Sequence, residues 1–190
     1  DGTFDEEIIL KIKNALPGAT LITSSIINKN LEKLLPIHKF PILHQKRKEY
    51  PHIKKLTDIH TIPGKWKLVL DSDMLFWNEP KEIIKWLENP VSPIHMVDCE
   101  QSYGYSDKLM EKLKGNKIPS LINVGVLGIN SETINWEEIE EWVGFLENEE
   151  GKTYYLEQAL SAMLISDQQP IALSKLAYKV NPTKEDILNR

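Results

Sequence analysis

The chain has 190 residues, of which 41% are hydrophobic and 27% charged, and its formal net charge is −5 at pH 7. This length suits a single domain, residues 1–190, and the acidic balance gives no electrostatic reason to bind nucleic acid. Cys99 is the single cysteine, which excludes an internal disulfide and suits a cytoplasmic location. No apolar run is long enough to span a bilayer, so we expect no transmembrane segment, while peripheral attachment to a membrane stays open.

The first predicted element is a helix close to the N-terminus. Thr3 and Glu6 have the spacing of a capping box, in which two side chains satisfy backbone N–H groups at a helix start. Four apolar residues then recur on one helical face, namely Ile8, Ile9, Ile12 and Leu16. We expect this helix to follow a strand upstream of residue 1, so that the domain is truncated at its N-terminus.

Strand-like and helix-like segments alternate along the rest of the chain. The predicted strands are 19–23, 66–70, 94–98, 122–129 and 171–174, with a further one at 177–180. The predicted helices have apolar faces built on Leu31, Leu34 and Leu35, on Ile83, Ile84 and Leu87, and on Ile139, Trp142, Val143 and Leu146. Asn78 and Ser131 are candidate caps for the last two helices, and Pro80 suits a first turn. This alternation predicts an α/β fold with a mostly parallel, Rossmann-like sheet flanked by helices.

Two acids follow the predicted strand 66–70 in the sequence D-S-D. The strand is almost continuously apolar, as expected of a central strand buried on both faces. Ligands of open α/β sheets bind beyond the carboxyl ends of strands, and extended residues two apart point the same way, so Asp71 and Asp73 can converge on one cation. Carboxylate oxygens select hard ions, which makes Mn²⁺ or Mg²⁺ the expected cofactor. The alternative is a polar turn, but the apolar residues on both sides leave little room for an ordinary solvated one.

Polar residues also interrupt two later apolar segments. Asn123 and Gly125 lie within the predicted strand INVGVLGIN, where glycine often marks the close approach of another group and asparagine offers both a donor and an acceptor. Glu157 and Gln158 interrupt the predicted amphipathic helix YYLEQALSAML. The alternatives are a buried strand with a bulge for the first pair and the solvent-exposed side of a helix for the second.

In this order, LVLDSDMLFW, INVGVLGIN and YYLEQALSAML resemble the motifs of nucleotide-sugar glycosyltransferases of the GT-A fold, close in pattern to glycogenin and the bacterial lipopolysaccharide galactosyltransferases. The resemblance implies a single GT-A domain, a nucleotide-diphosphate sugar as donor, and a divalent metal that bridges the diphosphate. The sugar would be transferred to a carbohydrate, a lipid-linked glycan or a protein acceptor.

The resemblance also assigns the acids and a nearby lysine. Asp71 and Asp73 would hold the metal, and Asp71 would in addition approach the ribose of the donor. A basic residue on the preceding helix helps to bind the donor in similar enzymes, and Lys55 is the best placed, with Lys54 second. A solvated helix face is the ordinary alternative for both lysines.

The remaining site assignments concern the sugar. Similar retaining enzymes carry an Asp-Gln pair in which the acid contacts sugar hydroxyls and the glutamine lies close to the anomeric carbon. Glu157 and Gln158 take these places and are assigned as catalytic, with Glu one methylene longer than Asp, and Gln158 favours transfer with retention of configuration. Asn123, Gly125 and Asp98, which ends the predicted strand 94–98, are assigned to substrate binding.

Similar transferases supply a third metal ligand, commonly a histidine, from a segment further downstream. His95 is the last histidine of this chain, and its five histidines lack the i,i+4 spacing of a helical metal pair. We therefore expect the third ligand to lie outside residues 1–190. A domain truncated at both ends in this way would bind metal loosely and transfer little sugar by itself.

Two other functions stay open for such an acidic site. A nucleotidyltransferase would use a similar metal site but release pyrophosphate, and a non-catalytic sugar- or nucleotide-binding module would bind its ligand without turnover. Outside the three motifs, the basic run 45–48 is typical of a solvated helix face, with an anionic acceptor or a membrane surface as the lesser alternative. Trp77, close to the D-S-D sequence, is a further candidate for a sugar contact.

Overall fold

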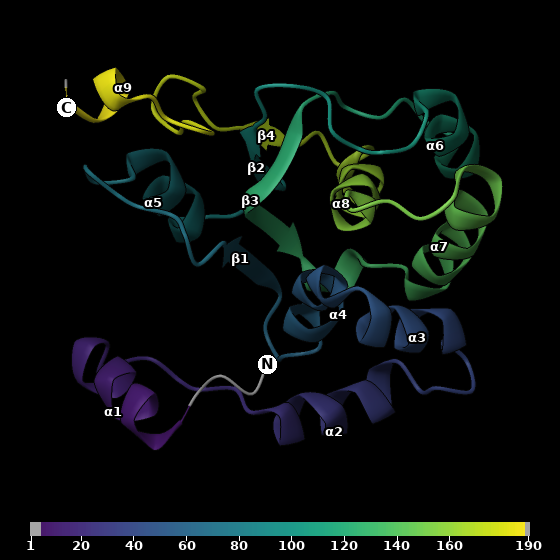
Figure 1. Ribbon diagram of the computed structural model, residues 1–190, viewed down its shortest axis with the longest axis horizontal. Coiled ribbons are helices and arrows are strands. Elements are labelled where there is room, and N and C mark those ends of the chain that lie inside the picture. The colour runs from purple at the N-terminus through teal and green to yellow at the C-terminus, as the bar shows by residue number, and fades with distance from the viewer. Residues whose placement is uncertain (1–4, 189–190) are drawn as a thin grey trace.

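The computed structural model describes residues 5–188, which form a four-stranded sheet flanked by helices (Figure 1). The strands are β1 (Trp66–Leu70), β2 (Ile94–Val97), β3 (Ile122–Asn130) and β4 (Ile171–Ala172). The helices are α1 (Glu6–Ala15), α2 (Ser24–Leu34), α3 (Pro41–Glu49), α4 (Lys54–His60), α5 (Lys81–Glu88), α6 (Asp107–Lys114), α7 (Trp136–Glu150), α8 (Leu156–Ile165) and α9 (Lys184–Leu188), with short 3₁₀ helices η1 (Pro51–Ile53) and η2 (Ser131–Thr133). No helix within residues 5–188 is long and apolar enough to cross a membrane.

The sheet is mixed, which corrects the expectation of a mostly parallel one. The strand order is β1-β3-β2-β4, and β3 is antiparallel to both of its neighbours while β2 and β4 are parallel. The connection from β2 to β3 begins and ends at the same end of the strands, where the Asp98 N–H donates to the Leu121 carbonyl at 2.8 Å. Helix α6 lies within this connection. The alternation of strands and helices in a sequence does not reveal whether such a helix carries the chain across the sheet to a parallel strand or leads back to an antiparallel one.

Strand β1 lies at an edge of the described sheet and not at its centre. Val69 is its only buried residue, and Leu70 is 42% exposed. The interior strands are β3 and β2, and every residue of β3 except Asn123 is buried. The apolar run 66–70 therefore predicts a strand correctly but does not fix its position in the sheet.

Two of the predicted strands do not form. Residues 19–23 are a loop that ends at Thr23, whose hydroxyl caps α2 by accepting from the Ile26 N–H at 3.4 Å. Residues 177–180 form turns and bends after β4, which is itself shorter than the predicted strand 171–174. Short apolar runs of this kind form strands only where a partner strand is available.

The helix caps also differ from the prediction. The N-cap residues are Asp5 for α1, Pro80 for α5 and Asn135 for α7. The predicted caps Asn78 and Ser131 are therefore wrong, and Thr3 lies outside the described residues. The predicted apolar face of α1 buries none of its residues.

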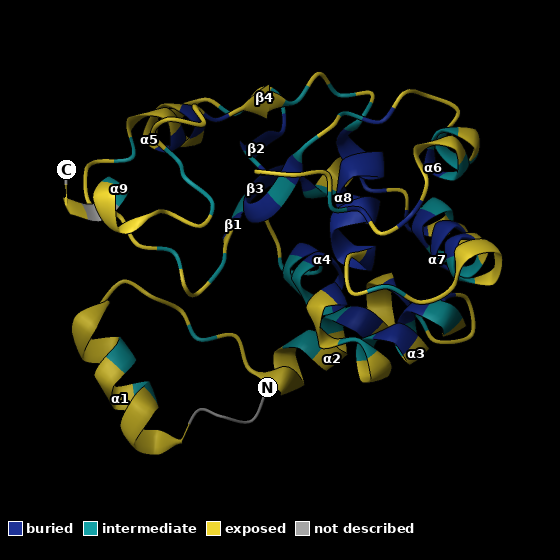
Figure 2. Cartoon of the chain, turned by 45° about the horizontal axis from the view of Figure 1, so that its top comes forward, coloured by how far each residue is buried: buried dark blue, intermediate teal, exposed yellow. Residues whose placement is uncertain are grey.

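The sheet separates two parts of the core. Helix α8 packs on one face and is buried along its whole length (Figure 2). The β3 residues on this side are Ile122, Val124, Leu127 and Ile129. On the other face the core cluster contains Ile83 and Trp86 of α5 with Ile94, Met96 and Val126 of the sheet. The strand ends and the start of α8 are therefore held in fixed positions by packing on both sides.

We expect Gly128→Ala to lower the melting temperature by several degrees. A Cβ at Gly128 would lie 2.6 Å from Ile94 Cγ2 and 2.6 Å from the Trp86 ring, which has no flexible end to move away, and overpacking of this kind costs about 1–3 kcal/mol. Gly144→Ala in α7 is the matched control, because its Cβ would meet only the flexible end of Ile42 at 3.1 Å and alanine favours the helix. Thermal unfolding compares the two, and equal melting temperatures would refute the tight contact.

Candidate functional site

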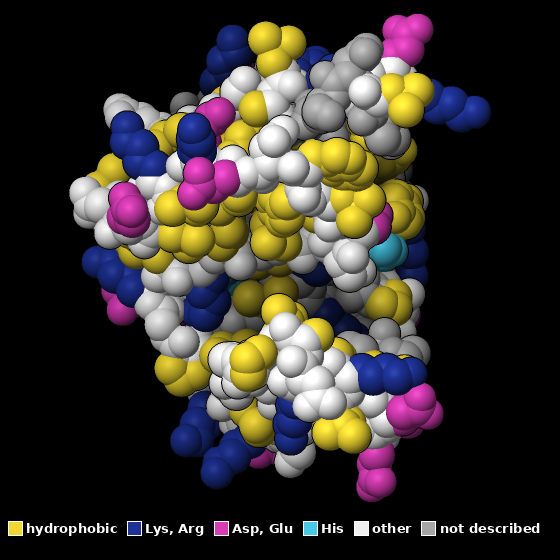
Figure 3. Space-filling view, turned by 90° about the vertical axis from the view of Figure 1, so that its left-hand side faces the viewer, with side chains coloured by type: hydrophobic (Ala, Val, Ile, Leu, Met, Phe, Trp, Pro, Cys, Tyr) yellow, Lys and Arg dark blue, Asp and Glu magenta, His cyan; other side chains and the backbone are white. Residues whose placement is uncertain are grey.

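A pocket of about 1090 Å³ opens at the sheet edge where β1 and β2 end. Its lining comes from the loop 71–82, from 123–126 of β3, from the start of α8 with the two residues before it, from the region of η1 and α4, and from the C-terminal segment 176–182. On the side of the molecule that carries α5 and α9, hydrophobic side chains gather above a hollow (Figure 3). The pocket therefore joins segments that are far apart in the sequence.

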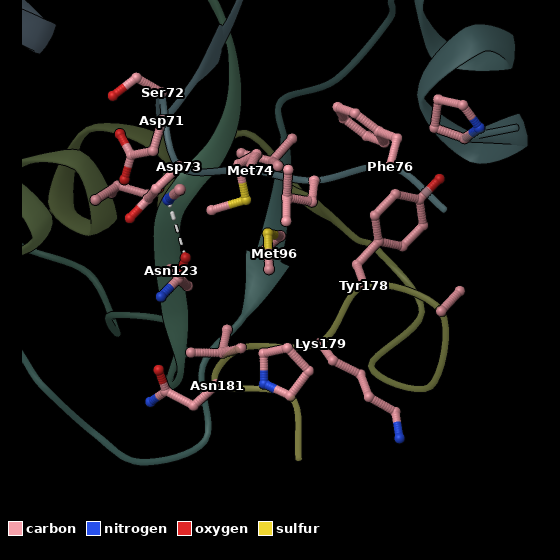
Figure 4. Close-up of a pocket in the computed structure, with 18 of the residues that line it drawn as sticks. Asp71, Ser72, Asp73, Met74, Phe76, Met96, Asn123, Tyr178, Lys179 and Asn181 are labelled. Carbon is pink, nitrogen blue, oxygen red and sulfur yellow. Dashed lines mark hydrogen bonds between the residues drawn. The ribbon is translucent and has the colours of Figure 1, made fainter. Parts of the chain in front are cut away.

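The two acids of the D-S-D sequence both line this pocket. The Asp71 N–H donates to the Gly125 carbonyl at 2.9 Å, which continues the pairing of β1 with β3 by one residue and fixes the start of the loop. Figure 4 draws Asp71, Asp73 and Asn123 among the residues that line the pocket. Asp73 is exposed, and its side chain makes no hydrogen bond or ion pair with the rest of residues 5–188. Both acids therefore line one cleft, whereas their convergence on one cation and their role as metal ligands stay predictions.

Lys55 neutralises the more buried of the two acids. Its Nζ lies 2.7 Å from Asp71 Oδ1 and 3.7 Å from Glu157 Oε2, and it donates to the Val124 carbonyl at 3.3 Å. The lysine thus joins α4, the D-S-D loop, β3 and α8 at one point. A solvated helix face, the alternative for Lys55, is wrong, because only 24% of its side chain is exposed.

Glu157 is a buried acid in the first turn of α8. Burial raises the pKa of its carboxyl to about 7, the Lys55 ammonium acts in the opposite direction, and the negative charge of Asp71 raises the pKa further. The Ser161 hydroxyl donates to Glu157 Oε1 at 3.4 Å. Helix α8 is buried on all sides and is not amphipathic, so the alternative of a solvent-exposed Glu157 and Gln158 is wrong.

Glu157→Gln is expected to stabilise the protein more at pH 8 than at pH 5. The folded-state pKa of about 7 lies above the ordinary glutamate pKa of 4.5, so the folded state binds more protons between these pH values, and the contribution of Glu157 to stability falls as pH rises through this window. The change in ΔΔG between pH 5 and pH 8 is about 2 kcal/mol. Urea unfolding at both pH values measures it, with exposed Glu132→Gln as the control, and an effect of Glu157→Gln that is independent of pH would contradict the assigned pKa.

Asp98 lies behind the pocket and not in it. It is only 6% exposed, and its Oδ2 accepts from Asn123 Nδ2 and from Gln158 Nε2, both at 3.1 Å. Its Oδ1 accepts from the Cys99 N–H at 2.8 Å. The predicted substrate-binding role of Asp98 is therefore corrected: its carboxylate is occupied by two side-chain amides and cannot reach a ligand.

Gly125 lies in an irregular part of β3. Consecutive residues of β2, His95 and Met96, pair with Leu127 and Asn123, so residues 124–126 form a bulge between these partners. The Gly125 N–H donates to Asn123 Oδ1 at 2.9 Å, and a Cβ at Gly125 would lie 2.5 Å from Met74 Cε and 3.7 Å from Asp71 Oδ2. Both interpretations of the strand hold in part, because a bulge is present and it brings the backbone close to the acids.

Several pocket residues carry no functional signal in the sequence. Four rings line one side, which we call the aromatic wall: Tyr50, His52, Tyr154 and Tyr155. The C-terminal segment contributes Tyr178, Lys179 and Asn181 (Figure 4). Tyr154 and Tyr155, two adjacent tyrosines shortly before Glu157, are the one sign of the wall in the sequence, whereas the sequence predicts a strand over 177–180 of the C-terminal segment. Trp77, the predicted sugar contact, also lines the pocket and is 45% exposed.

The carboxylates of the pocket suit a hard metal ion whose remaining coordination positions are filled by water and a bound substrate. Asp71 and Asp73 are the two carboxylates at the end of β1, and residues 5–188 contain no group of three or more His, Cys, Asp or Glu side chains placed to hold a metal. Mg²⁺ is commonly bound by one or two carboxylates together with water and substrate phosphates, so these two side chains suit it.

Comparison of the chain with family models, with curated proteins and with solved structures found no match.

Proposed function

We propose that the chain is a metal-dependent glycosyltransferase that moves a sugar from a nucleotide-diphosphate donor to an acceptor hydroxyl. One observation carries the proposal: three segments that resemble GT-A motifs contribute Asp71 and Asp73, Asn123 and Gly125, and Glu157 and Gln158 to a single pocket. A volume of about 1090 Å³ suits a nucleotide sugar together with part of an acceptor.

The acids and the lysine form the diphosphate end of the proposed site. A Mn²⁺ or Mg²⁺ ion held by Asp71 and Asp73 would stabilise the negative charge that develops on the leaving diphosphate. Lys55 balances Asp71 in the free protein at 2.7 Å. Its ammonium is within reach of a phosphate once other positive charge compensates the carboxylate, and Glu157 Oε2 lies 3.7 Å from it on the other side.

The amides form the sugar end. Gln158 Nε2 is turned to the buried Asp98, and the only buried side-chain polar atom without a hydrogen-bond partner in residues 5–188 is the Tyr105 hydroxyl. Gln158 Oε1 makes no hydrogen bond with these residues, so it is the amide atom open to the pocket. In the proposed reaction Gln158 Oε1 lies against the anomeric carbon, where a partial positive charge develops. The bond from this carbon to the phosphate oxygen breaks, a bond to the acceptor oxygen forms, and the acceptor proton leaves with the diphosphate.

The test is a thermal-shift panel of nucleotide sugars with and without Mn²⁺. A ligand at 100 times its Kd stabilises the native state by about 2.7 kcal/mol, which raises the melting temperature of a domain of this size by roughly 5–10 °C. We expect one nucleotide sugar to do so only when Mn²⁺ is present. No shift with any of them refutes the proposal, release of pyrophosphate indicates a nucleotidyltransferase, and binding without turnover in a longer chain indicates a non-catalytic module.

A further inference from the structure

The aromatic wall is a continuous set of rings along one side of the pocket. The ring centroids of Tyr50 and His52 lie 5.3 Å apart, those of His52 and Tyr154 4.9 Å, and those of Tyr154 and Tyr155 5.5 Å. Tyr154 is 66% exposed and Tyr155 40% exposed. Tyrosine combines an apolar ring face with a polar hydroxyl, so this wall offers flat apolar area edged with hydrogen-bonding groups.

The wall is fixed to the start of α8. The Tyr50 hydroxyl donates to the Tyr154 carbonyl and accepts from the Glu157 N–H at 3.4 Å, so it bridges the turn that leads into the helix. On the other side Gly104 packs tightly on the same turn, because a Cβ there would lie 2.2 Å from Thr153 Oγ1, and the φ of +71° suits glycine. A ligand that stacks on the wall is therefore held at a defined distance from Glu157 and from its neighbour Gln158.

This position distinguishes two ligands that could stack on the rings. In the proposed reaction Gln158 lies against the anomeric carbon, and the attacking acceptor oxygen must come within about 3–3.5 Å of that carbon. The nucleobase of the donor is separated from the same carbon by a ribose and two phosphates. Tyr154 and Tyr155, which precede Glu157 by three and two residues, therefore lie beside the place of the acceptor and not beside the place of the base.

We infer that the aromatic wall is the acceptor subsite and that its ligand is a neutral saccharide. The assignment of the wall as an acceptor subsite rests on the proposed function, but saccharide binding can be measured whether or not the protein transfers a sugar. A pyranose ring presents C–H groups on its faces and hydroxyl groups around its edge, which match the faces and the hydroxyls of Tyr154 and Tyr155. The nearby Lys152 is paired with Glu49 at 2.9 Å, so this lysine offers no uncompensated charge to an anionic ligand.

The experiment titrates the protein with glucose, galactose, N-acetylglucosamine, maltose, cellobiose and lactose, and follows binding by saturation-transfer and protein-detected NMR. We expect at least one saccharide to bind, about 10-fold weaker binding in Tyr154→Leu, and binding within about 3-fold of the wild type in Tyr154→Phe, which keeps the ring. Phe145→Ala is the matched control, because this exposed aromatic on α7 lies outside the pocket. Tyr154 is largely exposed, so its variants are expected to fold.

A second arm measures UDP, GDP, ADP and CDP in the presence of Mn²⁺. Saccharide binding that depends on the Tyr154 ring supports the subsite even if no nucleotide binds, in which case the proposed transferase function alone fails. Equal saccharide binding in the wild type and Tyr154→Leu, or no saccharide binding at all, overturns the inference while leaving nucleotide binding unaffected. Loss of nucleotide binding in Tyr154→Leu with unchanged saccharide binding also overturns it and assigns the wall to the nucleobase.

Discussion

Asp73→Asn is expected to lower the Mn²⁺-dependent affinity of the protein for a nucleoside diphosphate by at least about 100-fold. Removal of a group that only orients a metal ligand already costs 10- to 100-fold in metal affinity in other proteins, and loss of a ligand itself costs at least as much. Because the Asp73 side chain has no partner among residues 5–188, the substitution breaks no contact and leaves the fold intact. Isothermal titration with and without Mn²⁺ measures the effect.

Asp167→Asn provides the control for this experiment. Asp167 is an exposed acid that pairs with Lys114 at 3.1 Å outside the pocket, so its substitution changes the net charge equally without touching the site. Asp71→Asn is less clean, because it also removes the partner of Lys55. If Asp73→Asn and the wild type show the same Mn²⁺ dependence, the D-S-D sequence is a polar turn and the metal site is wrong.

The sequence predicted which polar residues meet in the site but not how they are arranged. Asp71, Asn123 and Gln158 each interrupt an apolar segment. Burial of such groups is costly unless they are hydrogen-bonded or paired with a charge, so their convergence on one pocket could be expected. The direction of β3 could not, because it depends on the path of the connection between β2 and β3. The role of Asp98 was also hidden, since the sequence IHMVD does not reveal that the carboxylate turns inward to two amides.

The basic run 45–48 shows a similar limit. It was predicted to be a solvated face, yet Lys46 is 4% exposed and lies 2.7 Å from Glu147 Oε2. Arg47 donates to both carboxylate oxygens of Asp58, at 2.6 and 2.8 Å. A local pattern of charges cannot reveal partners that come from α4 and α7, and only a tertiary contact decides which members of a charged run are buried.

The network around Asp98 leads to the second large effect. The carboxylate only accepts, and it receives four hydrogen bonds: from the N–H and the thiol of Cys99, from Asn123 and from Gln158. An amide at this position has one accepting oxygen and one donating nitrogen. In Asp98→Asn the new amide therefore faces a second donor whichever way it turns. If the amide nitrogen of Asn at position 98 faces Cys99, it meets the Cys99 N–H, which is also a donor. If this nitrogen instead faces Asn123, the Asn123 side chain must flip, and the Asn123 nitrogen then meets the Gly125 N–H.

Asp98→Asn is expected to destabilise the protein by about 1–3 kcal/mol and to lower kcat/KM for transfer by about 10- to 100-fold. Asp98 acts in this case through the orientation of Asn123 and Gln158 and does not touch the substrate. Binding of nucleoside diphosphate with Mn²⁺ depends on Asp71 and Asp73 and should stay within about 3-fold of the wild type. The Kd for nucleoside diphosphate divided by the Kd for nucleotide sugar isolates the sugar contacts. This ratio should fall even where turnover is too slow to measure. An unchanged ratio would show that Asp98 has a structural role only.

The double variant Asp98→Asn with Asn123→Asp separates stability from function. An aspartate at 123 accepts from the Gly125 N–H with one oxygen and from the new amide at 98 with the other, and the amide oxygen at 98 accepts from the Cys99 N–H, so these hydrogen bonds are restored. The second hydrogen of that amide then points to Gln158, which must flip and turn its own NH₂ group into the pocket in place of Oε1. Urea unfolding should therefore return most of the lost stability, while the preference for nucleotide sugar over nucleoside diphosphate and the rate of transfer stay low. Recovery of both together would show that the orientation of Gln158 is irrelevant to the sugar, and recovery of neither would contradict the hydrogen-bond network assigned to Asp98.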